Sequence, residues 1–291
     1  SKVPDGLWNN CPACEAILYQ PELEKSLFVC PKCDHHLRIG ARTRMSIFLD
    51  GGSFQELATN VTTKDILKFK DTKSYAQRIK EAVSSTGEEE AIVIAKGKLD
   101  GAEIVVAAFE FRYMGGSMGG AVGTKFVQGV DAAIKNKIPL ICFSTSGGAR
   151  MQESMVSLMQ MAKTSAALEK LKEAKLPYIS VMIDPIYGGV SASIAMLGDI
   201  NIAEPKALVG FAGGKQPRAV VNNNLMPIAY ANCAHPRHEF FHRRNHMWQF
   251  RAMVANIIKI KETRARNMRA LILGKRVALG AGQIPRRIQN P

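Results

Sequence analysis

Two pairs of glycines stand where backbone amides could do chemistry. Gly147 and Gly148 follow an apolar run at residues 138–143, and Gly188 and Gly189 follow another at residues 178–183. Each run predicts a buried strand, and a helix is expected to begin after each glycine pair. Because glycine has no side chain, its N–H can approach a ligand closely, and the dipole of the following helix favours negative charge there. The two breaks therefore predict an oxyanion hole built from backbone alone.

A third glycine-rich stretch, MGGSMGG, contains Gly115 and Gly116 and precedes a predicted helix at residues 120–134. Its four glycines within six residues indicate a loop with close backbone approach. The nearby Gly123 and Thr124 resemble the end of a phosphate-binding loop. The spacing that such a loop needs is missing, so binding of a nucleoside triphosphate there is rejected. For one glycine pair alone, tight strand–helix packing is the better explanation, but two pairs in matching contexts together with the MGGSMGG loop favour a functional role.

Side chains suited to catalysis are scarce around these glycines. Residues 37–213 contain no histidine, and Ser146 does not lie in a G-x-S-x-G nucleophile elbow. No paired acidic motif stands in the glycine loops. The remaining chemistry is stabilisation of an enolate or oxyanion of a thioester, where the substrate or a cofactor supplies the base.

Four cysteines form a second chemical motif, C-x2-C-x15-C-x2-C, with zinc spacing. The ligands expected for one tetrahedral zinc ion are Cys11, Cys14, Cys30 and Cys33. A closed set of four thiolates predicts a structural ion in a ribbon with two short strands between the cysteine pairs. Nucleic-acid contact and capping of an active site are the functional alternatives. The neighbouring His35 and His36 are expected to be ordinary surface or packing residues.

The elements that position these motifs alternate between strands and helices, which predicts an α/β domain. The clearest is a hairpin, in which residues 91–95 and 104–109 flank Asp100 and Gly101, a type I′ turn signal. Residues 86–90, which are rich in glutamate, predict a solvated turn.

Three helices are also expected. One spans residues 38–49 with Arg42 and Arg44 on a polar side, and one spans residues 72–83. A third begins after Gly148, where apolar side chains recur at the spacing of an amphipathic helix whose apolar stripe ordinarily faces the core. The stripe consists of Met155, Leu158, Met159 and Ala162.

The charge of the chain is unevenly distributed. The net charge is +14 over 291 residues, but residues 214–291 hold fifteen Lys and Arg against two Glu and no Asp. Residues 1–213 are close to neutral, so any attraction to nucleic acid belongs to the last segment. No run approaches eighteen apolar residues and no signal peptide is expected, so no membrane insertion is predicted. The paired cysteines fit a reducing compartment.

Several motifs together resemble one known family. The stretches CPAC…CPKCDHH, FRYMGGSMG, FSTSGGARMQE, SLMQMAKTSAAL, IYGGVSAS and NIAEPKALVGFAG are similar to the carboxyltransferase β subunits of acetyl-CoA carboxylases of the bacterial and plastid type. The resemblance implies an α/β, crotonase-like ββα superhelix with an N-terminal four-cysteine zinc ribbon. It covers residues 5–213, which divide into a ribbon at 5–36 and a carboxyltransferase domain at 37–213.

The resemblance also implies an activity and its partners. The reaction is transfer of a carboxyl group from carboxybiotin to acetyl-CoA, which gives malonyl-CoA in the first committed step of fatty acid biosynthesis. The implied partners are an α subunit, in an α2β2 heterotetramer, and a biotin carboxyl carrier protein, because this chain has no Met-Lys-Met biotinylation site. Released biotin would take the acetyl proton. The implied location is the cytoplasm, or the plastid stroma in a plant or alga.

Site roles follow from the resemblance residue by residue. Gly188 and Gly189 would donate the N–H groups of the oxyanion hole. The other loop glycines would line the substrate site, and the four cysteines would hold zinc. These substrate-lining residues are Gly115, Gly116, Gly147 and Gly148.

The resemblance ends near residue 213. Residues 214–291 form an atypical basic segment, which suggests a shifted reading frame or an unrelated fusion. The alternative is a genuine basic tail that binds RNA, and with the ribbon it would make the chain a zinc-ribbon RNA- or DNA-binding protein.

Overall fold

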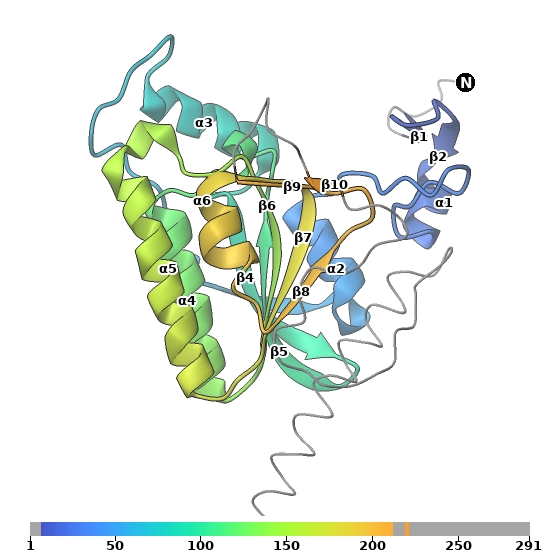
Figure 1. Ribbon diagram of the computed structural model, residues 1–291. Helices are drawn as coiled ribbons and strands as arrows, with labels where there is room; N and C mark the ends of the chain where they lie inside the picture. Colours follow the sequence, from blue (N-terminus) through green and yellow to red (C-terminus); the bar gives the residue numbers. More distant parts are fainter. Residues whose placement is uncertain (1–6, 212–218, 221–291) are drawn as a thin grey trace, which may run out of the picture.

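The computed structural model describes residues 7–211 and the strand residues 219–220. An eight-stranded sheet has the order β10-β9-β7-β6-β5-β4-β3, and β8 pairs with β7 beside this path (Figure 1). β5, β6, β7 and β8 run parallel, and the β3–β4–β5 and β9–β10 pairs are antiparallel. The strands of the sheet are β3 Phe54–Leu57, β4 Ile92–Leu99, β5 Ala102–Phe109, β6 Leu140–Ser146, β7 Tyr178–Ile186, β8 Ile200–Ala203, β9 Leu208–Val209 and β10 Ala219–Val220.

Helices cover both faces of this sheet. The helices α4 and α5 lie side by side over one face, and α2 lies against the other (Figure 1). The bounds are α1 Gln20–Lys25, α2 Ala41–Phe48, α3 Tyr75–Thr86, α4 Gly120–Asn136, α5 Met155–Glu173 and α6 Gly188–Val190, which continues as a π-helical turn at Ser191–Ala195. Within the described part of the chain, no helix is long and apolar enough to cross a membrane.

The core has two halves, one on each face of the sheet. Alternate residues of β4 show the division, since Ile92 and Ile94 pack under α4 while Val93 faces the α2 side. On the α2 side, the Phe48 ring meets the Phe143 ring of β6 edge to face at 4.9 Å. Such a contact adds about 1 kcal/mol to the burial of the rings. Burial on both faces explains why the central strands are continuous apolar runs.

The predicted hairpin is confirmed. β4 and β5 pair in register from Ile92 with Phe109 to Leu99 with Ala102. The turn residues Asp100 and Gly101 have φ values of 51° and 80°, as a type I′ turn requires. Both of their amides donate to the Asp50 carboxylate, at 3.0 and 2.8 Å.

Two local predictions about charged residues are wrong. Arg44 lies on the buried side of α2 rather than a polar side, because it pairs with Glu204 at 2.6 Å. The turn at residues 86–90 is not solvated, since Glu88 and Glu90 are both buried and hydrogen-bonded. A one-dimensional pattern marks a charge as polar but does not reveal a partner distant in the sequence.

The apolar stripe of α5 also lies differently from the expectation. Met155, Leu158 and Met159 are 63%, 48% and 59% exposed. The first half of α5 instead turns polar residues toward the protein, namely Ser157, Gln160 and Thr164, and apolar burial begins only at Ala167. Helix α4 has Gly123 where it faces Gln160, and the missing side chain leaves room for Gln160 between the two helices.

Candidate active site

The two predicted glycine breaks meet in space at the carboxyl ends of β6 and β7. A Cβ placed on Gly188 would lie 3.1 Å from the Cα of Gly148, so the two backbones touch. The N–H of Tyr187 donates to the carbonyl of Ser146 at 2.8 Å and ties the ends of the two strands together. Gly148 and Gly188 have φ values of 118° and 60°, which favour glycine. Ligands in parallel sheets bind at this edge.

The third glycine stretch joins the same place. The N–H of Gly147 donates to the carbonyl of Gly115, and the N–H of Met118 donates to that of Gly148, both at 2.8 Å. Gly116 packs so closely on Thr145 that a Cβ there would overlap the Thr145 carbonyl oxygen. Three stretches far apart in the sequence therefore form one cluster, which we call the glycine cluster: residues 114–120, 146–150 and 187–190.

One feature of the glycine cluster differs from the prediction. A helix begins directly at Gly188, but after Gly148 the chain first makes a one-residue bridge at Ala149 and a 3-10 turn at Met151–Glu153. Helix α5 starts only at Met155. Gly147 and Gly148 thus lie in a loop rather than at a helix N-terminus, so the helix dipole argument applies to Gly188 and Gly189 alone.

The amides of the glycine cluster are mostly engaged within the protein. Gly188 N–H donates to the carbonyl of Phe211 at 2.9 Å, and Gly148 N–H donates to Ser146 Oγ at 2.9 Å. Gly189 is different, because it is buried and no acceptor for its N–H lies among the described residues. A buried amide without an acceptor is rare in proteins. Of the two predicted donors, Gly189 is therefore the one whose amide has no acceptor among the described residues.

The N-terminus of α4, in contrast, already holds a carboxylate. Glu153 Oε2 accepts from Gly120 N–H at 2.6 Å, and its Oε1 accepts from the Tyr75 hydroxyl at 2.6 Å. This side chain satisfies a donor in the first turn of α4 and places negative charge at the positive end of the helix. The first turn of α4 is thus occupied by the protein itself.

A buried ion pair lies beneath the cluster. Arg150 and Glu90 both have fully buried side chains, 2.5 Å apart at Nη2 and Oε1. Burial opposes the charge of Arg150, but the attraction of Glu90 outweighs it and raises the pKa of the guanidinium. Burial also raises the pKa of Tyr75, which keeps its hydroxyl a donor to Glu153. Sequence reasoning missed these residues, although Arg150 follows the Gly147–Gly148 pair directly in GGARMQE.

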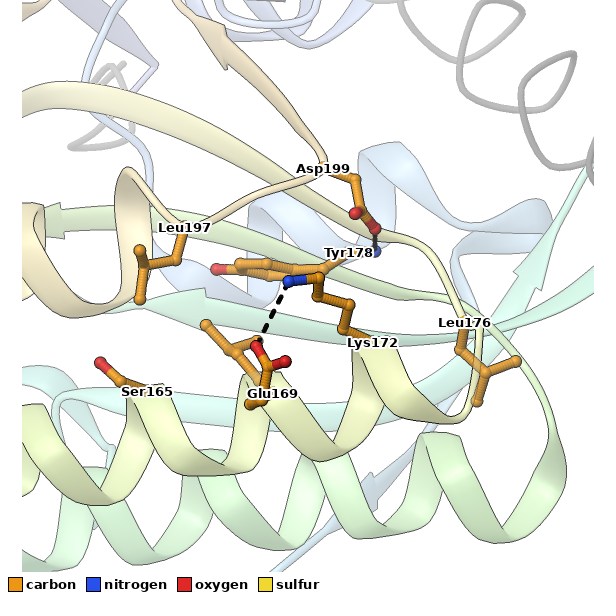
Figure 2. A pocket seen from close by; sticks show the side chains of 8 residues that line it. Ser165, Glu169, Lys172, Leu176, Tyr178, Leu197 and Asp199 are labelled. Carbon is orange, nitrogen blue, oxygen red and sulfur yellow. Dashed lines mark hydrogen bonds and ion pairs between the residues drawn. The ribbon is translucent and has the colours of Figure 1, made fainter. Parts of the chain in front are cut away.

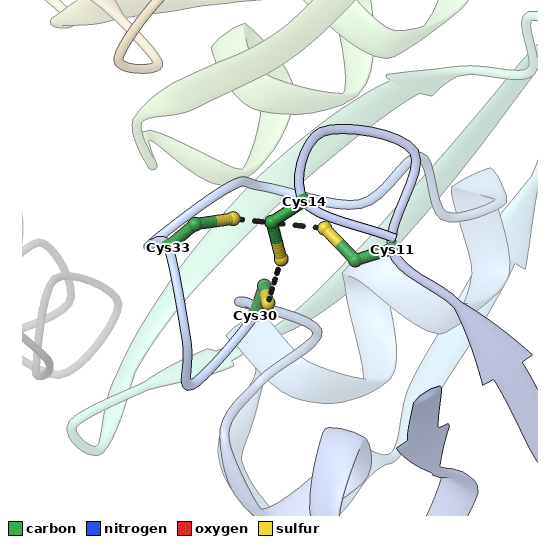
Figure 3. A group of neighbouring side chains, drawn as sticks. All are labelled: Cys11, Cys14, Cys30 and Cys33. Carbon is green, nitrogen blue, oxygen red and sulfur yellow. Dashed lines mark hydrogen bonds between the residues drawn. The ribbon is translucent and has the colours of Figure 1, made fainter. Parts of the chain in front are cut away.

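The four cysteines converge as predicted (Figure 3). Their sulfurs all lie within 4.8 Å of one another, with Cys11 and Cys33 at 3.6 Å and Cys14 and Cys30 at 3.8 Å. Zinc–sulfur bonds of about 2.3 Å in a tetrahedron put sulfur atoms about 3.8 Å apart, so the site fits zinc. In the described part of the chain, no histidine or carboxylate joins this group.

The two cysteine pairs sit in matching knuckles. The carbonyl of Cys11 accepts from Glu15 N–H at 2.9 Å, and that of Cys30 accepts from Asp34 N–H at 3.0 Å. Glu15 and Asp34 each have a φ of 57°. The segment between the knuckles differs from the predicted pair of strands, because β2 (Ile17–Tyr19) is followed by the helix α1. The other ribbon strand, β1 (Trp8–Asn10), precedes Cys11 and pairs with β2.

Ion pairs fasten the chain after the ribbon to the strand ends near the glycine cluster. Arg38 pairs with Asp184 of β7 at 3.0 Å. His36 and Arg44 approach Glu204 at 4.0 and 2.6 Å. Burial raises the pKa of Glu204, but Arg44 and His36 outweigh it and lower that pKa to about 2. His36 is therefore a packing residue, as predicted.

An exposed apolar surface borders the glycine cluster, and we call it the methionine face. It begins at the 3-10 turn after Arg150 and continues along the first two turns of α5. Its members are Met151, Met155, Val156, Leu158 and Met159, all between 36% and 68% exposed. Apolar surfaces of this kind mark interaction sites.

A separate small cavity lies at the other end of β7 (Figure 2). Its volume is about 170 Å³, and its lining includes Tyr178, Leu197, Asp199 and the Lys172–Glu169 pair. Tyr178 opens β7, whereas Gly188 follows the end of that strand. The cavity is smaller than the roughly 300–1,000 Å³ of ligand pockets and lies away from the glycine cluster, so it is not the candidate site.

Comparison with solved structures identifies the fold. Transcarboxylase 12S, with methylmalonyl-coenzyme A and methylmalonic acid bound, matches at 29% identity and a TM-score of 0.50, over 60% of this chain and 31% of that one. Its form with hydrolysed methylmalonyl-coenzyme A matches at 28% and 0.51, over 66% and 33%. A Pseudomonas malonate decarboxylase hetero-tetramer in complex with malonate matches at 27% and 0.46, over 60% and 62%. The chain thus spans about a third of the transcarboxylase chain, and its fold is the predicted crotonase-like α/β fold with a four-cysteine ribbon.

Family comparison agrees with this fold. Residues 8–33 match the acetyl-CoA carboxylase zinc finger domain. A second match, to the carboxyl transferase domain, covers residues 38–226 and so continues past residue 213, where the boundary stays a prediction. The segment at residues 214–291, predicted to be atypical and basic, lies outside the described residues except for 219–220. This second match covers more than half of the chain, so the chain belongs to the carboxyl transferase domain family.

Proposed function

We propose that this chain is the β subunit of an acetyl-CoA carboxylase carboxyltransferase. It would move a carboxyl group from carboxybiotin, held on a separate carrier protein, to acetyl-CoA and so form malonyl-CoA for fatty acid synthesis. The observation that carries the proposal is the glycine cluster, which brings three backbone loops to the carboxyl edge of a parallel sheet, with no acceptor for the Gly189 amide among the described residues. The matching zinc finger domain supports acetyl-CoA as the substrate. The methylmalonyl-coenzyme A bound to transcarboxylase supports a coenzyme A thioester.

In this reaction the chain would stabilise the negative charge that develops on the substrate. Deprotonation of the acetyl group puts negative charge on the thioester oxygen, and the N–H of Gly189 would donate to that oxygen. Such preorganised donors are among the largest contributions to catalysis. The nearby ionisable side chains, Arg150, Glu90 and Glu153, are buried and bonded to one another. All three are engaged in this network, and bound carboxybiotin would supply the carboxyl group and, after losing it, the basic nitrogen.

The methionine face supports a partner subunit. Five exposed apolar residues run from the end of the glycine cluster along α5, where the second half of an active site would lie. Methionine side chains are flexible and adapt to an apolar partner. We assign this face to the α subunit of the α2β2 assembly. The zinc thiolates need a reducing compartment, which favours the cytoplasm or the plastid stroma.

The proposal is tested by replacing Gly189 with proline and, as a matched control, with alanine. Proline removes the N–H that alanine keeps, and the first turn of a helix tolerates proline because that amide has no helical partner. A Cβ at this position meets the flexible side chain of Met161, with the sulfur at 3.2 Å, so the alanine control can be accommodated.

The measurement is carboxyl transfer between malonyl-CoA and a biotin derivative by this chain mixed with an α subunit. Activity should require both chains, and Gly189→Pro should lower kcat by about 10²–10³-fold relative to Gly189→Ala. Zinc content and assembly state show that each variant is folded. Equal turnover of the two variants would remove the donor role of Gly189, and an inactive wild-type mixture would reject the function.

Nucleic-acid binding by the ribbon is the second candidate. The rings of Trp8 and Tyr19 lie 5.1 Å apart on the exposed face of β1 and β2, where bases could stack. RNA affinity that falls steeply with salt, and falls again in Trp8→Ala, would support this candidate. Salt-independent or absent binding would reject it.

A further inference from the structure

Arg150 is the largest fully buried side chain in the described part of the chain, and its donors are all engaged. Nη2 donates to Glu90 Oε1 at 2.5 Å and to the Ser117 carbonyl at 2.8 Å. Nε donates to Ser117 Oγ at 3.2 Å. Nη1 donates to Thr63 Oγ1 at 3.0 Å and the Tyr75 hydroxyl at 3.1 Å. One guanidinium thus collects four segments that are far apart in the sequence.

One of these segments, residues 114–120, is a loop of the glycine cluster, and Arg150 itself lies in a second loop, residues 146–150. Arg150 N–H donates to the Met118 carbonyl at 2.9 Å, next to the bond from Met118 N–H to the Gly148 carbonyl at 2.8 Å. The side chain of Arg150 then holds Ser117, the neighbour of Met118, through two further bonds. The backbone ladder and the guanidinium together set the register of residues 114–120 against residues 146–150.

This register reaches the proposed oxyanion donor through the hydrogen bond from Tyr187 N–H to the Ser146 carbonyl and through packing of Gly148 on Gly188. Gly148 packs against Gly188, with a Cβ on Gly148 lying 3.4 Å from the Gly188 Cα and 3.7 Å from the Gly189 nitrogen. A shift of the 146–150 loop would therefore move or release the turn that carries the Gly189 N–H. Backbone-to-backbone packing leaves no flexible side chain to absorb such a shift.

Stability alone does not explain the buried ion pair between Arg150 and Glu90. Two buried charges lose much of their hydration, and apolar residues of similar volume often replace such pairs without loss of stability. Arg150 and Glu90 both have no exposed side-chain surface. A planar guanidinium does offer five donors in a fixed fork, which suits it to fixing the relative positions of several groups.

We propose that Arg150, oriented by Glu90, is a positioning residue that holds the two glycine loops in the register needed to present the Gly189 amide to the substrate. The inference rests on the proposed function. Arg150 itself touches no reacting atom and acts through Ser117, Gly148 and the Gly188 contact.

The test is the paired variant R150M/E90L, which removes both charges and so avoids leaving one of them buried alone. Its matched control is R44M/E204L, which removes the other largely buried Arg–Glu pair, 5% and 15% exposed and outside the glycine cluster. Each is assembled with the α subunit and assayed for carboxyl transfer and melting temperature. R150M/E90L should lose some stability, because Ser117, Thr63 and Ala91 each lose a hydrogen-bond partner, but it should keep its KM for malonyl-CoA. Its kcat should fall by about 10²-fold, as expected for a misplacement of about 1 Å.

The single variant R150K separates position from charge. Lysine keeps a positive charge for Glu90 but cannot reproduce the fork that holds Ser117, so kcat should stay well below wild type. Full activity in R150K would overturn the positioning role. A wild-type kcat in R150M/E90L, or a loss of kcat in R44M/E204L equal to that in R150M/E90L, would also overturn it.

A second readout keeps the inference separate from the proposed function. If the wild-type chain transfers no carboxyl group, the proposed function is rejected, and the positioning role of Arg150 is judged from amide hydrogen exchange. Exchange at residues 114–120 and 146–150 should then be faster in R150M/E90L than in R44M/E204L. Equal protection of these loops from exchange in the two variants would reject the positioning role of Arg150.

Discussion

Gly115 and Gly116 allow the packing of the glycine cluster to be separated from contact with a substrate. Both have a φ of 65°, so an alanine at either position adopts the same left-handed backbone. Their surroundings differ sharply. A Cβ on Gly115 would meet nothing within 4 Å, whereas one on Gly116 would overlap the Thr145 carbonyl and lie 3.3 Å from the Ser146 Cα.

The expected costs follow from these surroundings. Each alanine should lower the free energy of unfolding by about 1–2 kcal/mol, because a left-handed backbone is unfavourable for a residue with a Cβ. Gly116→Ala carries a further cost of about 1–3 kcal/mol, since the new methyl must push the loop off β6. The neighbouring bond from Gly147 N–H to the Gly115 carbonyl would move with that loop. A displacement near 1 Å would lower kcat by about 10²-fold.

The assay compares both alanine variants with wild type by urea denaturation of the zinc-loaded chain and by carboxyl transfer with the α subunit. Gly116→Ala should be the less stable and the less active variant. Gly115→Ala should report on the substrate, because its methyl points into open space beside Gly147 rather than into the protein. A raised KM with little extra loss of stability would place Gly115 against the substrate.

Two outcomes would refute this reasoning. Equal stability of the two variants would show that the contact between Gly116 and Thr145 does not restrict the loop. A fully active Gly116→Ala would show that the register of this loop does not matter for turnover, and a Gly115→Ala variant with wild-type kinetics would remove Gly115 from the substrate site.

Two further predictions concern the zinc ribbon and pH. Chelation of zinc should expose residues 8–33 to rapid hydrogen exchange while the sheet stays protected, because the buried core of the ribbon consists of Cys11, Leu18, Leu23 and Cys30 alone and is too small to fold without metal; unchanged exchange would contradict a structural ion. Glu204, whose pKa falls from 4.5 to about 2 in the folded chain, should contribute about 3 kcal/mol that is complete above pH 4.5 and lost as the pH falls toward 2. The difference in unfolding free energy between wild type and Glu204→Gln should shrink over this range, and a constant difference would remove the Glu204 carboxylate as its source.

Local signals in the sequence predicted the elements that local physics determines. The Asp100-Gly101 turn, the apolar strands β6 and β7 and the zinc spacing of the cysteines depend on neighbouring residues, and all appear as expected. The meeting of Gly148 with Gly188 could be anticipated only in part, because parallel strands place their carboxyl ends together but do not specify which atoms touch.

Charged residues with distant partners could not be predicted in this way. Glu90 looks like part of a solvated turn, yet its partner Arg150 comes sixty residues later. Arg44 likewise pairs with Glu204, which lies 160 residues further along the chain. Charge indicates exposure unless the fold supplies a counter-ion, and only the three-dimensional arrangement shows where that happens.

The methionine face shows why periodicity identifies an apolar side of a helix but not what covers it. The buried side of α5 is polar in its first half and apolar from Ala167 onward, and two of its polar side chains donate to carbonyls of their own helix. Thr164 Oγ1 donates to the Gln160 carbonyl at 2.9 Å, and Gln160 Nε2 donates to that of Val156 at 2.8 Å. These bonds lower the cost of burying the polar residues against α4, although Gln160 Oε1 has no hydrogen-bond partner among the described residues. The apolar side is then left outward, and removing it from water requires a second protein surface, which is the role we assign to the α subunit.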